Sequence, residues 1–258
     1  GCGIMKALIT GASSGIGKSF AYELAKKNID LILVARRKEN LQQITQEIQD
    51  KFHVKVNYVS LDITNLENVE KLIQENQDID ILINNAGFGD SGNFLDTDLD
   101  KELKMIDLNI KSLHFLTKKY LQIFSQKNYG YILNVSSLAA FQSGPKMATY
   151  YATKAYVLHL SEAINYELKK AKKQISITTL CPGPVNTEFN KVANVKFHLK
   201  ELDPNKVAKK AIIAMFKRKN IIIPSFIEKI GIFFQRFIPR RLSLSVVNKI
   251  QEKKQNGK

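Results

Sequence analysis

The 258-residue sequence predicts an α/β fold in which helices flank a parallel sheet, and three observations support this prediction. Short apolar runs alternate along the chain with segments whose apolar residues have helical spacing, which is typical of βαβ units. A glycine-rich turn separates the first apolar run from the first helical segment. A chain of this length commonly forms one such domain, and no repeat or linker divides it. We therefore expect a single domain over residues 1–258, with a core at about 5–223 and an extension at about 224–258.

Seven short runs rich in Ile, Leu and Val are the expected strands. In chain order they are residues 6–10, 31–35, 55–60, 79–84, 131–135, 175–181 and 221–223. The segments with helical periodicity are residues 18–27, 38–51, 66–75, 99–126, 149–172 and 204–217. One long irregular segment, 182–203, follows the sixth run. Because ligands bind at the carboxyl ends of parallel strands, we expect this segment to be a lid over a binding site.

Composition restricts the class of protein. Hydrophobic residues make up 44% and charged residues 24% of the chain, as in soluble globular proteins. Cys2 and Cys181 do not form a Cys-x-x-Cys pair, which favours a reducing, cytoplasmic compartment and argues against disulfides or a zinc site.

There is no run of about 18 apolar residues, so we expect no membrane-spanning helix. The chain passes directly into its first strand, so we expect no signal peptide, and Met5 is a plausible native start. We expect no metal site from the four scattered histidines, His53, His114, His159 and His198.

The net charge of +15 is concentrated near the carboxyl end. Residues 204–258 contain 14 Lys and Arg but only two acidic residues, Glu228 and Glu252. Within residues 224–250, apolar side chains recur every three or four positions, which predicts amphipathic helices surrounded by positive charge. We expect this extension to cap the active site or to form a subunit interface, and contact of residues 225–250 with anionic lipid is the alternative. We expect no nucleic-acid partner.

The glycine-rich turn predicts a dinucleotide site. Gly11, Gly15 and Gly17 follow the first strand and open the first helix, where a pyrophosphate can approach the backbone and the helix N-terminus. Three further residues of this turn are expected to contact the cofactor: Ser13, Ser14 and Ile16.

Two arginines, Arg36 and Arg37, end the second strand, where an NAD enzyme would need a carboxylate for the ribose 2′-hydroxyl. Since a guanidinium suits a 2′-phosphate better than a diol, we expect NADP(H) rather than NAD(H), with Arg36 contacting the phosphate. The alternative is that both arginines are a solvated helix start. Asp62, after the third strand, is placed either to accept from the adenine amino group or to cap the following helix.

The pair Tyr150 and Lys154 indicates proton-transfer chemistry. A spacing of four residues puts both side chains on one face of a helix. An ammonium beside a phenol favours the phenolate and lowers a pKa that is ordinarily about 10. Such a phenol can donate and accept protons near neutral pH. Tyr151 has no lysine four residues later and is expected to point elsewhere.

From residue 6 to about 223, the chain resembles the short, single-domain branch of the short-chain dehydrogenase/reductase family. The motifs that carry the resemblance are Thr10-Gly11-x-x-x-Gly15-x-Gly17, Asn84-Asn85-Ala86-Gly87, Asn109, Ser137, Tyr150-x-x-x-Lys154 and Pro182-Gly183-Pro184-Val185-Asn186-Thr187. The resemblance implies a Rossmann-type, doubly wound sheet of seven parallel strands in three αβα layers. It also implies a homo-oligomer, either a dimer or a tetramer.

The resemblance implies a role for each motif. Tyr150 would be the general acid/base, and Lys154 would lower its pKa and hold the nicotinamide ribose. Ser137, rather than its neighbour Ser136, lies thirteen residues before Tyr150, as the family's substrate-orienting serine does. Asn109 would hold a water in the proton relay. Asn85, Ala86 and Gly87 would lie beside the adenosine ribose, and Thr187 would meet the nicotinamide carboxamide. Pro182, Gly183 and Val185 would also contact the cofactor.

These roles imply an NADP(H)-dependent oxidoreductase that reduces a ketone or aldehyde, or oxidises the corresponding secondary alcohol. A 3-oxoacyl thioester is an alternative substrate. Two alternatives of other classes are a non-catalytic nucleotide-binding protein and a membrane-peripheral scaffold. The sequence favours the enzyme because Ser137, Tyr150, Lys154 and Asn109 are all present.

Overall fold

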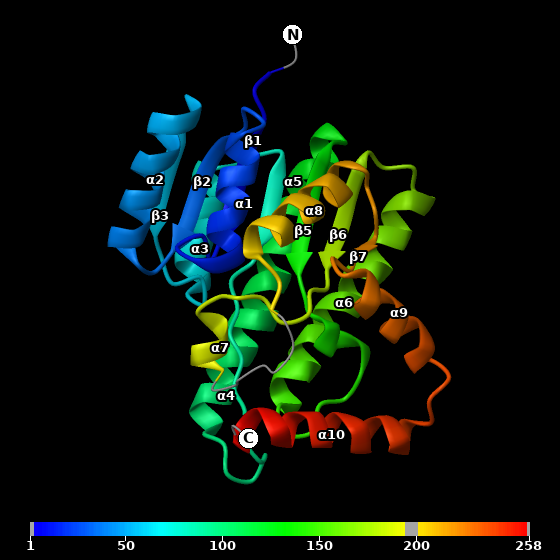
Figure 1. Cartoon of the computed structure of the whole chain (residues 1–258). Coiled ribbons are helices and arrows are strands. Elements are labelled where there is room, and N and C mark those ends of the chain that lie inside the picture. Colours follow the sequence, from blue (N-terminus) through cyan, green and yellow to red (C-terminus); the bar gives the residue numbers. More distant parts are fainter. Residues whose placement is uncertain (1–2, 194–200, 257–258) are drawn as a thin grey trace.

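The computed structural model describes residues 3–193 and 201–256. Its strands form one sheet and are β1 (Lys6–Thr10), β2 (Asp30–Ala35), β3 (Val56–Ser60), β4 (Ile81–Asn84), β5 (Gly130–Val135), β6 (Ile175–Leu180) and β7 (Ile221–Ile222). Neighbouring strands are parallel, and the strand order is β3-β2-β1-β4-β5-β6-β7 (Figure 1). The predicted doubly wound, seven-stranded sheet is confirmed, and each strand lies within two residues of its expected bounds.

The order of the strands reverses between β1 and β4. The chain builds outward from β1 through β2 to β3, and β4 then pairs with the other side of β1. Such a reversal opens a crevice at the carboxyl ends of the two strands. The glycine-rich turn follows β1 and the Asn84–Gly87 motif follows β4, so the topology brings both motifs to this crevice.

Helices cover both faces of the sheet (Figure 1). One face packs against α1 (Gly15–Ala25), α2 (Lys38–Phe52) and α8 (Pro204–Phe216). The other packs against α3 (Leu66–Glu75), α5 (Leu113–Lys127) and α6 (Ala148–Lys170). The predicted three-layer αβα arrangement is therefore confirmed.

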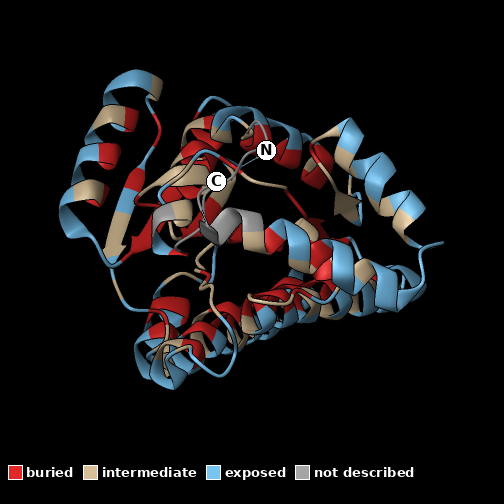
Figure 2. Cartoon of the chain, turned by 60° about the horizontal axis from the view of Figure 1, so that its bottom comes forward, coloured by how far each residue is buried: buried red, intermediate tan, exposed pale blue. Residues whose placement is uncertain are grey.

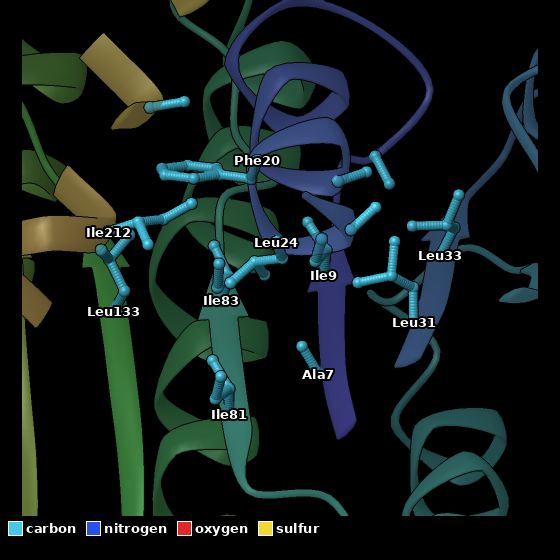
Figure 3. Packing of buried hydrophobic residues seen from close by; sticks show 14 of the residues in the cluster. Ala7, Ile9, Phe20, Leu24, Leu31, Leu33, Ile81, Ile83, Leu133 and Ile212 are labelled. Atoms are coloured by element: carbon cyan, nitrogen blue, oxygen red, sulfur yellow. The ribbon is translucent and has the colours of Figure 1, made fainter. Parts of the chain in front are cut away.

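The strands are apolar on both sides because each side meets helices. Ala7 and Ile9 of β1 lie in the same cluster as Phe20 and Leu24 of α1 (Figure 3). Leu8, between Ala7 and Ile9, belongs to the cluster on the opposite face. All five side chains are fully buried, and burial of apolar area is the main source of stability of such a core.

The helical segment expected at residues 99–126 is confirmed, but it is not α-helical throughout. α4 (Leu99–Ile106) and α5 are separated by a π-helical segment, Asp107–Ser112. This wider turn carries Asn109, whose side chain hydrogen-bonds to the backbone of Phe88 in the loop after β4. The apolar periodicity predicts this helical segment but does not reveal its π turn, a feature common at functional sites.

The expected lid, residues 182–203, is partly regular. It contains the short helix α7 (Phe189–Val192) and a bridge between Val185 and Leu202. Residues 194–200 of the predicted lid lie outside the described residues.

The carboxyl-terminal extension forms α9 (Phe226–Gln235) and α10 (Arg240–Asn256), and α10 crosses the carboxyl side of the sheet (Figure 1). Val247 of α10 is buried in a cluster with Met105, Met147 and Tyr151. The prediction that the extension caps the site is therefore confirmed for α10.

Within the described residues, no helix has the length and apolar character needed to cross a bilayer. The same ranges hold no cluster of three or more His, Cys, Asp or Glu side chains that could bind a metal ion. His198 and Cys2 lie outside these ranges. Cys181 is buried after β6, and burial raises the pKa of its thiol to about 12.

Candidate active site

The turn after β1 is so tightly closed that it requires glycine. Gly11 and Gly15 have φ angles of +64° and +54°, a region that favours glycine. A Cβ on Gly17 would lie 2.1 Å from Gly11 O. Asn85 holds the turn, since its Nδ2 donates to Thr10 O at 3.2 Å and to Gly11 O at 3.1 Å. The turn leads into the N-terminus of α1, whose backbone N–H groups suit a pyrophosphate.

A cleft of about 1040 Å³ runs past this turn, at the carboxyl ends of the strands. A cavity of this size can hold a dinucleotide and a small substrate. The predicted site residues that line it are Gly11, Ser13, Ser14, Gly15, Ile16, Arg36, Asp62, Asn85, Ala86, Gly87, Ser137, Tyr150, Lys154, Pro182, Gly183, Val185 and Thr187. Gly17 and Asn109 contact residues of this lining, Gly11 and Phe88 respectively.

Arg37 joins the glycine-rich turn to the lid segment at one end of the cleft. Its Nη2 donates to Ser14 Oγ at 2.6 Å and to Ser13 Oγ at 3.2 Å. Its Nη1 pairs with the carboxylate of Glu188 at 2.8 Å. The sequence analysis missed Glu188, because no local pattern relates a residue of the lid to the end of β2.

Asp62 lies beside Arg36 at the same end of the cleft. Its carboxylate accepts from Thr64 N at 3.0 Å and from Thr64 Oγ1 at 2.8 Å. Burial would raise the pKa of Asp62, but the Thr64 hydrogen bonds and the charge of Arg36 lower it below the ordinary value. The alternative that Asp62 caps α3 is wrong, since the N-cap is Asn65, whose side chain accepts from Asn68 N.

Tyr150, Lys154 and Ser137 meet at the other end of the cleft. Tyr150 and Lys154 lie one turn apart on α6, and Lys154 Nζ is 5.8 Å from the centre of the Tyr150 ring. Ser137 lies beside the Tyr150 phenol, close enough for hydrogen bonding to lower the pKa of that phenol. Ser136 instead donates from its buried Oγ to Lys154 O at 2.8 Å. Ser137 is therefore the serine beside the Tyr150 phenol, and Ser136 bonds to the backbone of α6.

The pKa of Tyr150 does not move in the expected direction. Burial raises it above the ordinary value of 10.0, and the hydrogen bond with Ser137 opposes this rise without reversing it. Lys154 Nζ donates to Val135 O at 3.1 Å, and burial lowers its pKa to about 8. In the protein alone, burial of the phenol therefore dominates its pKa, and the expected lowering of that pKa by Lys154 stays a prediction.

Asn109 connects the loop after β4 to α6. Its Nδ2 donates to Phe88 O at 2.9 Å and to Thr153 Oγ1 at 3.1 Å, and its Oδ1 accepts from Phe88 N at 3.1 Å. A Cβ on Gly87 would lie 3.0 Å from Asn109 Oδ1 and 3.5 Å from Lys154 Nζ. Asn109 is thus buried next to the lysine, while its expected contact with a relay water stays a prediction.

The sequence analysis missed two side chains around the tyrosines. The Phe189 ring of α7 lies 5.4 Å from the Tyr150 ring, and only its place in the predicted lid could have drawn attention to it. Gln251 of α10 donates to Tyr151 Oη at 2.7 Å. This contact turns the second tyrosine towards the cap, and no local pattern predicts it because the two residues are 100 positions apart.

The chain is similar to proteins of known families along most of its length. A sequence model of the family described as short chain dehydrogenase matches residues 5–196. An NADP-dependent 3-hydroxy acid dehydrogenase of Schizosaccharomyces pombe is 36% identical over 231 residues, which cover 84% of this chain and 88% of that protein.

Two solved structures are similar along nearly the whole chain. A short-chain dehydrogenase from Sphingobium yanoikuyae in complex with NADPH has a TM-score of 0.81 and 30% identity, covering 92% of this chain and 96% of its own. A bulky-bulky ketone specific alcohol dehydrogenase from Comamonas testosteroni has a TM-score of 0.79 and 30% identity, covering 91% and 92%.

Proposed function

Because the chain belongs to the short-chain dehydrogenase/reductase family, whose members are oxidoreductases, we propose that it reduces a ketone or aldehyde by hydride transfer, or oxidises the corresponding secondary alcohol. The observation that carries this proposal is the meeting of Ser137, Tyr150 and Lys154 at one end of a cleft large enough for a dinucleotide. A non-catalytic nucleotide-binding protein would have no need of these three side chains together.

NADP(H) is the cofactor of this enzyme. Arg36 and Arg37 end β2, where they suit a 2′-phosphate, and no acidic residue stands in their place. The Schizosaccharomyces pombe relative is NADP-dependent, and the Sphingobium structure contains NADPH. When bound, the cofactor supplies the hydride. The glycine-rich turn would hold its pyrophosphate, with Lys154 at the nicotinamide ribose and Thr187 at the carboxamide.

Ser137 and Tyr150 act on the carbonyl oxygen. Both side chains line the cleft and Ser137 lies close enough to lower the pKa of the phenol, so both hydroxyl groups can turn to donate to one carbonyl oxygen beside them. The raised pKa of Tyr150 keeps the phenol protonated until negative charge develops on that oxygen, to which it then gives its proton. The buried ammonium of Lys154 stabilises the phenolate that remains. Asn109 positions the loop and helix that carry these groups.

The substrate end of the cleft favours a carbonyl compound with an apolar body. Its lining includes Met147, Phe189, Val192, Val247 and Ile250. Two relatives whose names give a substrate are a 3-hydroxy acid dehydrogenase and an alcohol dehydrogenase specific for bulky ketones. We propose a ketone as the substrate, and a 3-oxoacyl thioester stays the alternative. We also propose that the enzyme works in the cytoplasm as a dimer or tetramer.

The test is a screen of ketones and aldehydes with NADPH and with NADH. Turnover is measured as the loss of nicotinamide absorbance. Tyr150→Phe should abolish turnover while leaving the affinity for NADPH nearly unchanged, because the phenol transfers a proton but does not hold the nucleotide. Tyr151→Phe is the matched control and should retain turnover. Unchanged turnover in Tyr150→Phe would refute the acid/base role.

A further inference from the structure

α9 and α10 meet at a corner, residues 233–241, that combines exposed aromatic rings with exposed arginines. Phe233, Phe234 and Phe237 are 55%, 60% and 73% exposed. The centre of the Phe233 ring lies 5.5 Å from that of Phe234 and 5.9 Å from that of Phe237, so the three rings form one cluster. The arginines of the corner are also exposed, and they are Arg236, Arg240 and Arg241.

The apolar surface extends from the corner along both helices. None of the side chains of α9 is buried, and Phe226 and Ile227 at its start are 75% and 82% exposed. On α10, Leu242, Val246 and Ile250 recur every four residues and are about half exposed. Figure 2 brings α10 to the front and shows exposed residues along its outer side. Exposed apolar surface of this extent usually marks a binding surface.

Specific polar contacts hold α9 in place although its outer side is uncovered. Gln235 Nε2 donates to Gln142 Oε1 at 2.7 Å and to Phe141 O at 3.3 Å. Glu228 accepts from the backbone N–H of Gly183, and burial raises the pKa of this carboxyl. The helix is therefore fastened to the loops beside the active site and presents a fixed outer face.

The charge of that outer face is positive. No acidic residue occurs between Glu228 and Glu252, and Glu228 is turned inward against Gly183. The same stretch contains five cationic residues: Lys229, Arg236, Arg240, Arg241 and Lys249. Each of these five side chains is exposed.

We propose that α9 and α10 dock on an anionic lipid bilayer, with the corner 233–241 entering the headgroup region. Exposed phenylalanines bury their rings at the boundary of headgroups and acyl chains, while neighbouring arginines pair with anionic headgroups. A second copy of this chain is a poorer occupant, because a two-fold contact would bring the positive surface against itself.

Docking would place the mouth of the cleft at the bilayer surface. Val247 and Gln251, on the inner side of α10, line the cleft and contact the tyrosine pair. Ile250 lines the same cleft and is 45% exposed. The docking surface therefore borders the opening through which a substrate enters. The docking itself does not depend on the proposed reaction.

Vesicle flotation of the full chain tests the proposal. The protein is expected to float with vesicles of phosphatidylcholine and phosphatidylglycerol, to stay behind with pure phosphatidylcholine, and to be released by high salt. Arg240→Glu/Arg241→Glu should lower the partition coefficient by about 25-fold or more, since each cation near an anionic surface contributes about fivefold. Phe233→Ser/Phe237→Ser should also abolish flotation.

Two matched variants control for general charge and general apolarity. Lys27→Glu/Lys55→Glu reverses two exposed cations that precede β2 and β3, at the amino ends of the strands and opposite α10 (Figure 1). Leu95→Ser/Leu99→Ser removes two exposed leucines, 96% and 65% exposed, outside the extension. Both should float like the wild type.

Three results would overturn the proposal. Wild-type protein that binds NADPH but does not float with anionic vesicles excludes docking. If the variants of the corner float like the wild type, lipid contacts another part of the protein and the proposed docking surface is wrong. If Phe233→Ser/Phe237→Ser instead turns an oligomer into monomers in analytical ultracentrifugation, and the wild type does not float, the corner is a subunit interface. None of these readouts requires turnover, so they are independent of the proposed reaction.

Discussion

Replacing Lys154 with methionine removes a charge that the folded protein buries, and it keeps most of the length of the side chain. Lysine has an ordinary pKa of 10.5, and burial lowers that of Lys154 to about 8. Lys154 is 6% exposed, so little solvent screens it. The difference between the two pKa values corresponds to a destabilisation of the folded state by about 3 kcal/mol at pH 7.

Removing the buried charge stabilises the folded variant, but a lost hydrogen bond offsets part of this stabilisation. Methionine cannot donate to Val135 O, a hydrogen bond of 3.1 Å in the wild type whose loss costs about 1 kcal/mol. We therefore expect Lys154→Met to be more stable than the wild type by about 2 kcal/mol at pH 7, while turnover is lost. If Lys154 is catalytic, the protein keeps it although it lowers the free energy of unfolding.

The dependence of this difference on pH has a definite sign. Below about pH 8 the lysine is protonated in both states, and the folded wild type carries the whole penalty. Between about 8 and 10.5 the folded state releases its proton first, so the unfolded state binds more protons and the stability of the wild type rises with pH. The advantage of Lys154→Met should therefore shrink across this window.

The assay is urea unfolding of wild type and variant at pH 7 and at pH 9.5, with the free energy of unfolding compared at each pH. Lys170→Met, an exposed lysine on the same helix, is the control and should change stability little at either pH. The reasoning is refuted if Lys154→Met is less stable than the wild type at pH 7, or if its advantage is the same at both pH values.

Two further predictions concern the cofactor site. Arg36→Asp should shift the preference from NADPH towards NADH by about 10-fold to 100-fold in kcat/KM, because a charge-assisted contact to the 2′-phosphate is lost; an unchanged ratio would contradict the assignment of Arg36. Gly17→Ala puts a methyl group 2.1 Å from Gly11 O, so the turn must open. We expect a loss of about 2 kcal/mol in unfolding free energy and weaker NADPH binding in calorimetry, and wild-type values in both measurements would show that the turn is not rigid.

The sequence by itself determined the sheet, the glycine-rich turn and the spacing of Tyr150 and Lys154. These features depend on local geometry: apolar runs form buried strands, positive φ angles require Gly11 and Gly15, and a spacing of four places Tyr150 and Lys154 on one face of α6. Each of these needs only a few consecutive residues to be specified.

Only the tertiary structure decided how the groups of the site affect one another. The pKa of Tyr150 rises because segments distant in the sequence, such as α7 with Phe189, exclude water from the phenol. The contact between Gln251 and Tyr151 joins residues 100 positions apart and turns α10 into a cap. The desolvation and packing of a side chain depend on neighbours from every part of the chain. The spacing of residues along the sequence does not specify those neighbours.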